Sequence, residues 1–176
     1  MVIDCIFECG AERIHAVLDA DQSLWGGSLL GVPIMGGDDL LDELVRSGVN
    51  SFVVGLGSVG SSLLRRRLFE FGLSRALNPH PVIHPQALIS KWAKIGPGCQ
   101  FLPGSIVNAG AVLGANVIVN SGAIVEHDCI IGDHSHVATG ARLSGAVRVD
   151  KGAHIGVGSC IKQGVTIGAD SIVGAG

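Results

Sequence analysis

The chain has 176 residues, which is enough for one medium-sized domain or for a small domain followed by a larger one. Apolar residues make up 47% of it, but every apolar run is interrupted before it reaches the roughly 18 residues of a spanning helix, so no membrane insertion is expected. A net charge of −3 provides no basic surface for nucleic acid, and five cysteines without a CxxC pair or a secretory signal favour a cytoplasmic protein.

Residues 1–80 have the pattern of a small α/β unit. We expect strands at residues 15–19 and 49–54 and helices at residues 38–47 and 61–71. Because strands alternate with helices, this order predicts a Rossmann-like domain with a parallel sheet.

A glycine-rich turn, residues 55–60 (GLGSVG), joins the second expected strand to the helix that follows it. Such a turn lets backbone N–H groups approach a phosphate at a helix N-terminus. The acidic residue that an NAD site needs about twenty positions later is missing, because the chain there reads Asn78-Pro79-His80. Two interpretations therefore stay open: a nucleotide-binding loop, and a plain turn that requires small residues.

A six-residue repeat begins at Ile83 and continues to Val173. An aliphatic or aromatic residue occupies every sixth position, and a small or β-branched residue follows four positions later. Three positions after each aliphatic or aromatic residue, glycine, asparagine or aspartate dominates, which is typical of a corner with positive φ. Each repeat thus predicts a short strand and a corner, and three repeats predict one triangular coil. Residues 81–176 are expected to form a parallel β-helix.

These features together resemble a known enzyme family. They are the order of the two parts, the linker at residues 80–87, and the VEHDCIIG motif at residues 125–132. The chain resembles the sugar acyltransferases of the sialic-acid O-acetyltransferase and bacillosamine N-acetyltransferase type, and residues 18–37 are similar to that family's second strand and following loop. The resemblance implies a left-handed β-helix that transfers an acetyl group from acetyl-CoA to an amine or hydroxyl of a sugar, often a nucleotide-linked one.

The resemblance also implies roles for individual residues. His127 matches the family's general base, and Asp128 matches the acidic residue that raises its basicity. His136 and the backbone at Val157 and Ala175 match contacts with the coenzyme.

In the α/β unit, Asp19 and Gly57 match positions that hold the nucleotide of the acceptor. The family has a strand and a glycine-rich loop before this segment, a pair of aspartates where this chain has Asp19-Ala20, and a further coil after residue 176. We expect the chain as given to lack that first strand, that loop and that coil.

The chemistry can also be argued from the residues themselves. An acceptor amine or hydroxyl loses a proton as it attacks a thioester, and a neutral imidazole accepts a proton near pH 7. His127 follows the interior residue Val125 by two positions and so stands at a corner. Either neighbour, Glu126 or Asp128, could orient its ring. Gly145, one coil later, could offer a backbone N–H to the thioester oxygen.

His136 and His154 are 18 residues apart and should stack one coil above the other. Since the flat apolar faces of a prism need cover, we expect a homotrimer in which His127 works beside His136 of the next chain. Two other interpretations stay open: an inactive scaffold, and a metal site of the γ-carbonic-anhydrase type built from these histidines and His134. The spacings match no zinc pattern, so no metal is expected.

Overall fold

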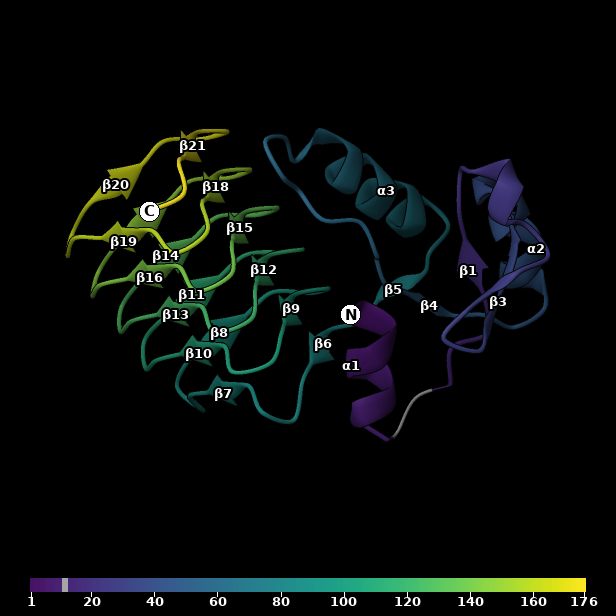
Figure 1. Cartoon of the computed structure of the whole chain (residues 1–176), viewed down its shortest axis with the longest axis horizontal. Helices are drawn as coiled ribbons and strands as arrows, with labels where there is room; N and C mark the ends of the chain where they lie inside the picture. Colours follow the sequence, from purple (N-terminus) through teal and green to yellow (C-terminus); the bar gives the residue numbers. More distant parts are fainter. Residues whose placement is uncertain (11–12) are drawn as a thin grey trace.

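The computed structural model describes residues 1–10 and 13–176. Residues 82–173 form a triangular prism of two-residue strands, which carries the rest of the chain on one side (Figure 1). Each strand pairs in parallel with the strands 18 residues before and after it, as Ile124 does with Ile106 and Arg142. Three such parallel stacks are typical of the left-handed β-helix that the repeat and the resemblance predicted.

The three faces are named by their order along the chain. The first face contains β7 (Leu88–Ile89), β10 (Ile106–Val107), β13 (Ile124–Val125), β16 (Arg142–Leu143) and β19 (Cys160–Ile161). The second face contains β8 (Lys94–Ile95), β11 (Val112–Leu113), β14 (Ile130–Ile131), β17 (Arg148–Val149) and β20 (Thr166–Ile167). The third face contains β6 (Val82–Ile83), β9 (Gln100–Phe101), β12 (Ile118–Val119), β15 (His136–Val137), β18 (His154–Ile155) and β21 (Ile172–Val173).

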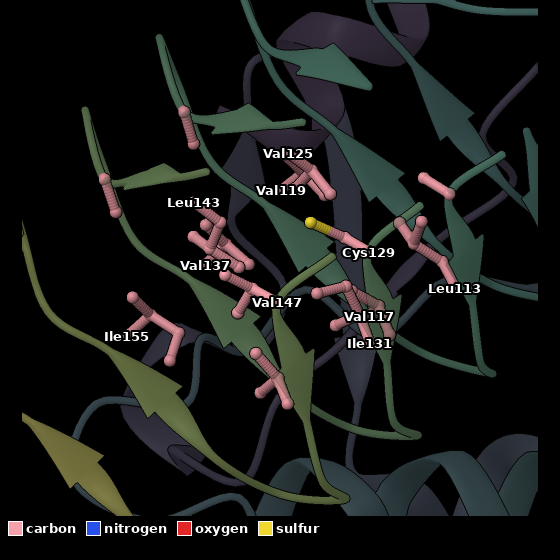
Figure 2. Packing of buried hydrophobic residues seen from close by; sticks show 14 of the residues in the cluster. Leu113, Val117, Val119, Val125, Cys129, Ile131, Val137, Leu143, Val147 and Ile155 are labelled. Carbon is pink, nitrogen blue, oxygen red and sulfur yellow. The ribbon is translucent and has the colours of Figure 1, made fainter. Parts of the chain in front are cut away.

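Aliphatic side chains fill the prism. In Figure 2, Val125, Leu143 and Cys129 belong to one continuous cluster of buried side chains, and each of the three is at most 1% exposed. The predicted interior series is confirmed from Phe101 to Ile167. It is wrong for Ile83, which is 41% exposed, because no coil precedes it to cover its side chain.

The corners have the predicted left-handed backbone. The φ angle is +56° at Asn116 and +60° at Asp128, both of which are residue types that tolerate positive φ. Ala146 also has a φ of +57°, although alanine has no preference for this conformation. The stacking of coils therefore imposes the turn even where the residue type does not favour it.

The N-terminal part contains the expected mixture of helices and strands, which are α1 (Val2–Glu8), β1 (Val17–Leu18), η1 (Gln22–Leu24), β2 (Ser28–Leu29), β3 (Val32–Gly36), η2 (Asp38–Leu40), α2 (Leu41–Arg46), β4 (Ser51–Phe52), α3 (Leu63–Ser74) and β5 (Asn78–Pro79). Strand β3 pairs in parallel with β1 and antiparallel with β2, while β4 pairs in parallel with β5. These pairings confirm parallel strands, but not a single Rossmann-like sheet.

Helices α1 and α3 lie between the prism and the small sheet of β1, β2 and β3 (Figure 1). A buried cation holds the loop before α3 in place: Arg65 is 1% exposed and donates from Nη1 to the carbonyls of Val54 (2.8 Å) and Leu56 (2.6 Å). Gln100, on the third face, donates to the same Val54 carbonyl at 2.8 Å. The loop that follows β4 is thus tied both to α3 and to the prism.

Among the described residues, no helix has the length and apolar character needed to cross a membrane.

Candidate active site

His127 stands on the corner that joins the first face to the second. Val125 and Cys129 are both 0% exposed and anchor the chain on either side of it, while the positive φ of Asp128 turns the backbone. The corner is also bonded to both neighbouring coils: Asp128 N–H donates to the Ala109 carbonyl (3.1 Å), and the His127 carbonyl accepts from Ala146 N–H (2.9 Å). The backbone beneath the imidazole is therefore held on both sides.

The His127 ring has a carboxylate partner. Nδ1 lies 2.9 Å from Asp128 Oδ2, and because an ionised carboxylate only accepts, Nδ1 carries the proton and Nε2 keeps its lone pair. This hydrogen bond raises the pKa of His127, partly opposed by desolvation. Glu126 instead accepts the backbone N–H of His127 at 3.3 Å. Of the two carboxylates that the sequence left open, Asp128 is the partner of the ring.

Gly145 lies beneath the imidazole. A Cβ atom on this buried glycine would sit 2.6 Å from both Cε1 and Nε2 of His127, which is closer than carbon atoms approach. The ring therefore rests on bare backbone one coil further along. From the sequence we expected only a backbone donor at Gly145, and the spacing of 18 residues from His127 was the signal that joined the two positions.

His136 lies on the third face, which is opposite the corner that carries His127. Its side chain is 5% exposed, with Nδ1 donating to the Ser58 carbonyl (3.3 Å) and Nε2 accepting from the Asn120 amide (3.1 Å). Burial lowers the pKa of His136 to about 4, so the ring is neutral near pH 7. Within one chain, the structure does not bring His136 and His127 together.

The predicted stacking of His136 and His154 is confirmed. The two residues are paired in register, and their ring centroids are 5.0 Å apart in an edge-to-face arrangement. His154 also lines a cavity of about 240 Å³ between the third face and the start of α3, together with Ser61 and Asp170 among others. His134, which the sequence analysis named only in the alternative metal site, packs edge-on against Phe69 of α3 at 5.7 Å between ring centroids.

The two residues expected to hold the acceptor lie in different parts of the N-terminal segment. Asp19 follows β1, and its Oδ1 atom accepts the backbone N–H of Asp21 at 2.9 Å. Gly57 lines a cavity of about 50 Å³ against the third face, where His136 and Asn120 also lie. Gly57, which was expected to bind the acceptor, and His136, which was expected to bind the coenzyme, thus line the same cavity. Asn120, which fixes the tautomer of His136, was missed by the sequence analysis.

Val157 and Ala175 occupy equivalent positions in successive coils, on the corner that joins the third face back to the first. Both are exposed, and the Val157 carbonyl accepts from Gly176 N–H at 2.9 Å. Neither residue is next to His127 in the same chain, because they stand on a different edge of the prism.

Within residues 1–10 and 13–176, no three histidine, cysteine, aspartate or glutamate side chains gather closely enough to hold a metal ion. The four histidines considered for a zinc site have other partners or lie on different sides: His127 pairs with Asp128, and His134 accepts from Asn116 at 3.0 Å.

A prism of hexapeptide coils with a histidine–aspartate pair on a corner defines a class of transferases. Residues 110–145 match the family model of the bacterial transferase hexapeptide (six repeats). GDP-perosamine N-acetyltransferase of Escherichia coli O157:H7 is 29% identical over 170 residues, which is 96% of this chain and 73% of that protein.

Solved structures extend the match to nearly the whole chain. A histidine variant of perosamine N-acetyltransferase from Caulobacter crescentus, in complex with CoA and GDP-perosamine, superposes with a TM-score of 0.86 at 34% identity, covering 99% of this chain and 80% of that one. The acetyltransferase domain of PglB from Neisseria gonorrhoeae, in complex with acetyl coenzyme A, gives 0.83 at 31% identity, covering 99% and 82%. The chain belongs to the hexapeptide-repeat sugar acetyltransferases, a family of enzymes.

Proposed function

We propose that this protein transfers the acetyl group of acetyl-CoA to the amino group of a nucleotide-linked sugar, with His127 as the general base. The observation that carries the proposal is the His127–Asp128 pair, with Nδ1 bound to the carboxylate at 2.9 Å and the ring 56% exposed. The relatives support the choice of ligands, since one is a complex with CoA and GDP-perosamine and another a complex with acetyl coenzyme A.

The residues of the corner fit this reaction. Acetyl-CoA supplies the acetyl group as a thioester, whose C–S bond breaks as the new C–N bond forms. His127 Nε2 takes the proton that the acceptor amine loses and passes it to the departing sulfur, so that free thiol is the second product. Asp128 holds the tautomer and stabilises the imidazolium that forms in between. Gly145 has no side chain, and the space this leaves is filled by the imidazole of His127.

The complete site is proposed to lie between two copies of the chain. His136, Val157 and Ala175 are the proposed coenzyme contacts, and none of them is on the corner that carries His127. A homotrimer would place the His127 corner of one copy beside the third face of the next, and it would also cover exposed apolar side chains such as Val112 and Ile130.

The two parts of the chain are proposed to bind different substrates. Residues 1–80 would hold the nucleotide of the acceptor through Asp19 and Gly57. Residues 81–176 would carry the coenzyme and the base. All five cysteines are free, which supports a reducing, cytoplasmic compartment.

The test measures release of free thiol from acetyl-CoA with a panel of nucleotide-linked amino sugars, GDP-perosamine included. His127→Ala should lower kcat about 100- to 10,000-fold, the usual contribution of a general base. His15→Ala, which removes an exposed histidine of the N-terminal segment, should retain full activity. A His127→Ala enzyme that keeps a tenth or more of the wild-type kcat would show that the base is elsewhere.

A further inference from the structure

The cavity of about 240 Å³ between α3 and the prism lies outside the proposed reaction site. Its walls come from the start of α3, from β18 and β21 at the end of the third face, and from the corners that precede these two strands (Figure 1). It is lined neither by His127 nor by Asp19 or Gly57. Pockets for drug-sized ligands measure roughly 300–1,000 Å³, so this cavity suits a smaller ligand, about the size of a single ring.

Ser62 presents a hydroxyl without a partner to this cavity. The residue is 5% exposed and stands at the N-terminus of α3, where a serine commonly accepts a helix N–H. Its side chain makes no such cap bond, and within the described residues it has no other hydrogen-bonding partner. Because an unpaired buried hydroxyl is costly, a molecule held in the cavity is expected to complete its hydrogen bonds.

The carboxylate of Asp170 lies on the same wall. Its backbone is held at a corner by a φ of +54° and by a hydrogen bond from its N–H to the Lys151 carbonyl at 2.9 Å. A Cβ atom on Gly152, in the coil before, would collide with Asp170 Oδ1 and would lie 2.9 Å from Ser62 Oγ. The bare backbone of Gly152 therefore lets the carboxylate and the hydroxyl face the same space. In the described part of the chain, Asp170 forms no ion pair and no side-chain hydrogen bond.

The cavity also has an apolar wall and a ring that can donate or accept a hydrogen bond. Leu63 and Ile172 line it and are 68% and 59% exposed. His154 contributes the ring, which His136 holds edge-on at 5.0 Å between centroids.

The charges around the cavity exclude strongly charged ligands of either sign. The carboxylate of Asp170 repels an anion, and the N-terminus of α3 carries a partial positive charge that repels a cation. A ligand that fits both is neutral, has hydroxyl groups that donate and accept, and has an apolar face for Leu63 and Ile172.

We propose that this cavity binds the neutral ring of a sugar, with Asp170 and Ser62 at its hydroxyl groups and Leu63 and Ile172 against its apolar face. A sugar ring carries hydroxyl groups along its edge and C–H groups on its faces, and a carboxylate is a common acceptor for ribose hydroxyls. Two sources share this chemistry, the ribose of a nucleoside and a hexose. The proposal does not rest on acetyl transfer, because the His127 corner takes no part in the cavity.

The experiment measures binding by saturation-transfer NMR and needs no turnover. The probes are methyl α-mannoside and methyl β-glucoside for a hexose, adenosine and guanosine for a ribose, and inorganic phosphate and ethylamine for charged ligands. Wild type should bind at least one neutral probe. Asp170→Asn weakens a hydrogen bond to a hydroxyl and Ser62→Ala removes one, so each should raise the Kd of that probe roughly three- to tenfold. Asp150→Asn is the matched control, since it removes an exposed carboxylate that does not line the cavity.

The tighter neutral probe identifies the source, and either a hexose or a nucleoside supports the proposal. A wild-type protein that binds no neutral probe would overturn it, as would Kd values within twofold of wild type in both Asp170→Asn and Ser62→Ala. Phosphate or ethylamine that binds more tightly than every neutral probe, and loses affinity in Ser62→Ala, would also overturn it. Circular dichroism checks that both variants fold, and since Ser62 Oγ makes no cap bond, α3 should stay intact in Ser62→Ala.

Discussion

His127 and His136 show how position alone gives one residue type two opposite properties. His127 is exposed and bound to a carboxylate, which raises its pKa, whereas burial lowers the pKa of His136 to about 4. Near pH 7, His136 is therefore a neutral ring with fixed donor and acceptor atoms, and His127 is the one with a free lone pair and access to a substrate.

At the scale of the residue, Asp128→Asn should move the acidic limb of the pH profile of kcat/KM. His127 works as a base only while neutral, so activity falls as the pH drops through its pKa. Asp128 is the largest cause of the raised pKa, and its removal should shift that limb to lower pH and reduce the plateau about tenfold or more. Asp150→Asn, on another corner, should leave the profile as it is. An unshifted limb in Asp128→Asn would contradict the assigned role.

At the scale of the element, the strands of the prism are too short to be stable alone. Each spans two residues and forms its hydrogen bonds with the coils on either side. For example, Ile124 N–H donates to the Ala141 carbonyl at 2.9 Å. Helix α3 is different, because its place is decided by shape: Gly72 faces the ring of Phe52, and Phe69 packs near it at 5.6 Å between ring centroids.

Gly72→Ala should therefore destabilise the protein although alanine is the better helix former. A Cβ atom there would lie 2.6–2.8 Å from three ring carbons of Phe52, and such overpacking costs about 1–3 kcal/mol against a propensity gain of about 1 kcal/mol. Urea unfolding measures the change, with Arg67→Ala on the exposed side of α3 as control. In a Phe52→Ala background the effect of Gly72→Ala should shrink; equal effects in both backgrounds would show that the ring is not the cause.

At the scale of the whole molecule, the His127 corner and the third face lie on opposite sides of one prism. A site that needs both must be shared between copies, and this geometry can be tested without any further structure.

Mixing two inactive variants should restore activity. If His127 of one chain works beside His136 of the next, an interface is active only when one chain supplies an intact His127 and its neighbour an intact His136. Dissociating and reassembling equal amounts of His127→Ala and His136→Asn should therefore yield about a quarter of wild-type activity, because the two chains at each interface are incorporated at random. Each variant alone, taken through the same procedure, is the control. Light scattering should give three times the chain mass of 18.0 kDa. No recovery from trimers of mixed composition would place both histidines in one chain's site.

The repeat made the prism predictable down to the residue. Interior positions such as Val125 and corner positions such as Asp128 follow from the six-residue period, because in a coil of three hexads the same position of each hexad points inward. The exception, Ile83, is an end effect that the period does not contain. The sequence also determined that His127 is exposed and that Gly145 lies one coil away from it.

The tertiary structure decided what the period could not. It placed Asp128 rather than Glu126 on the ring of His127, since both neighbours are acidic and only the turn of the corner brings one of them to Nδ1. It also put the Ser58 carbonyl over His136, through a loop 78 residues away in the chain. Contacts of that kind depend on how the N-terminal segment docks on the third face, and docking is governed by the shapes of both surfaces, which no local pattern records.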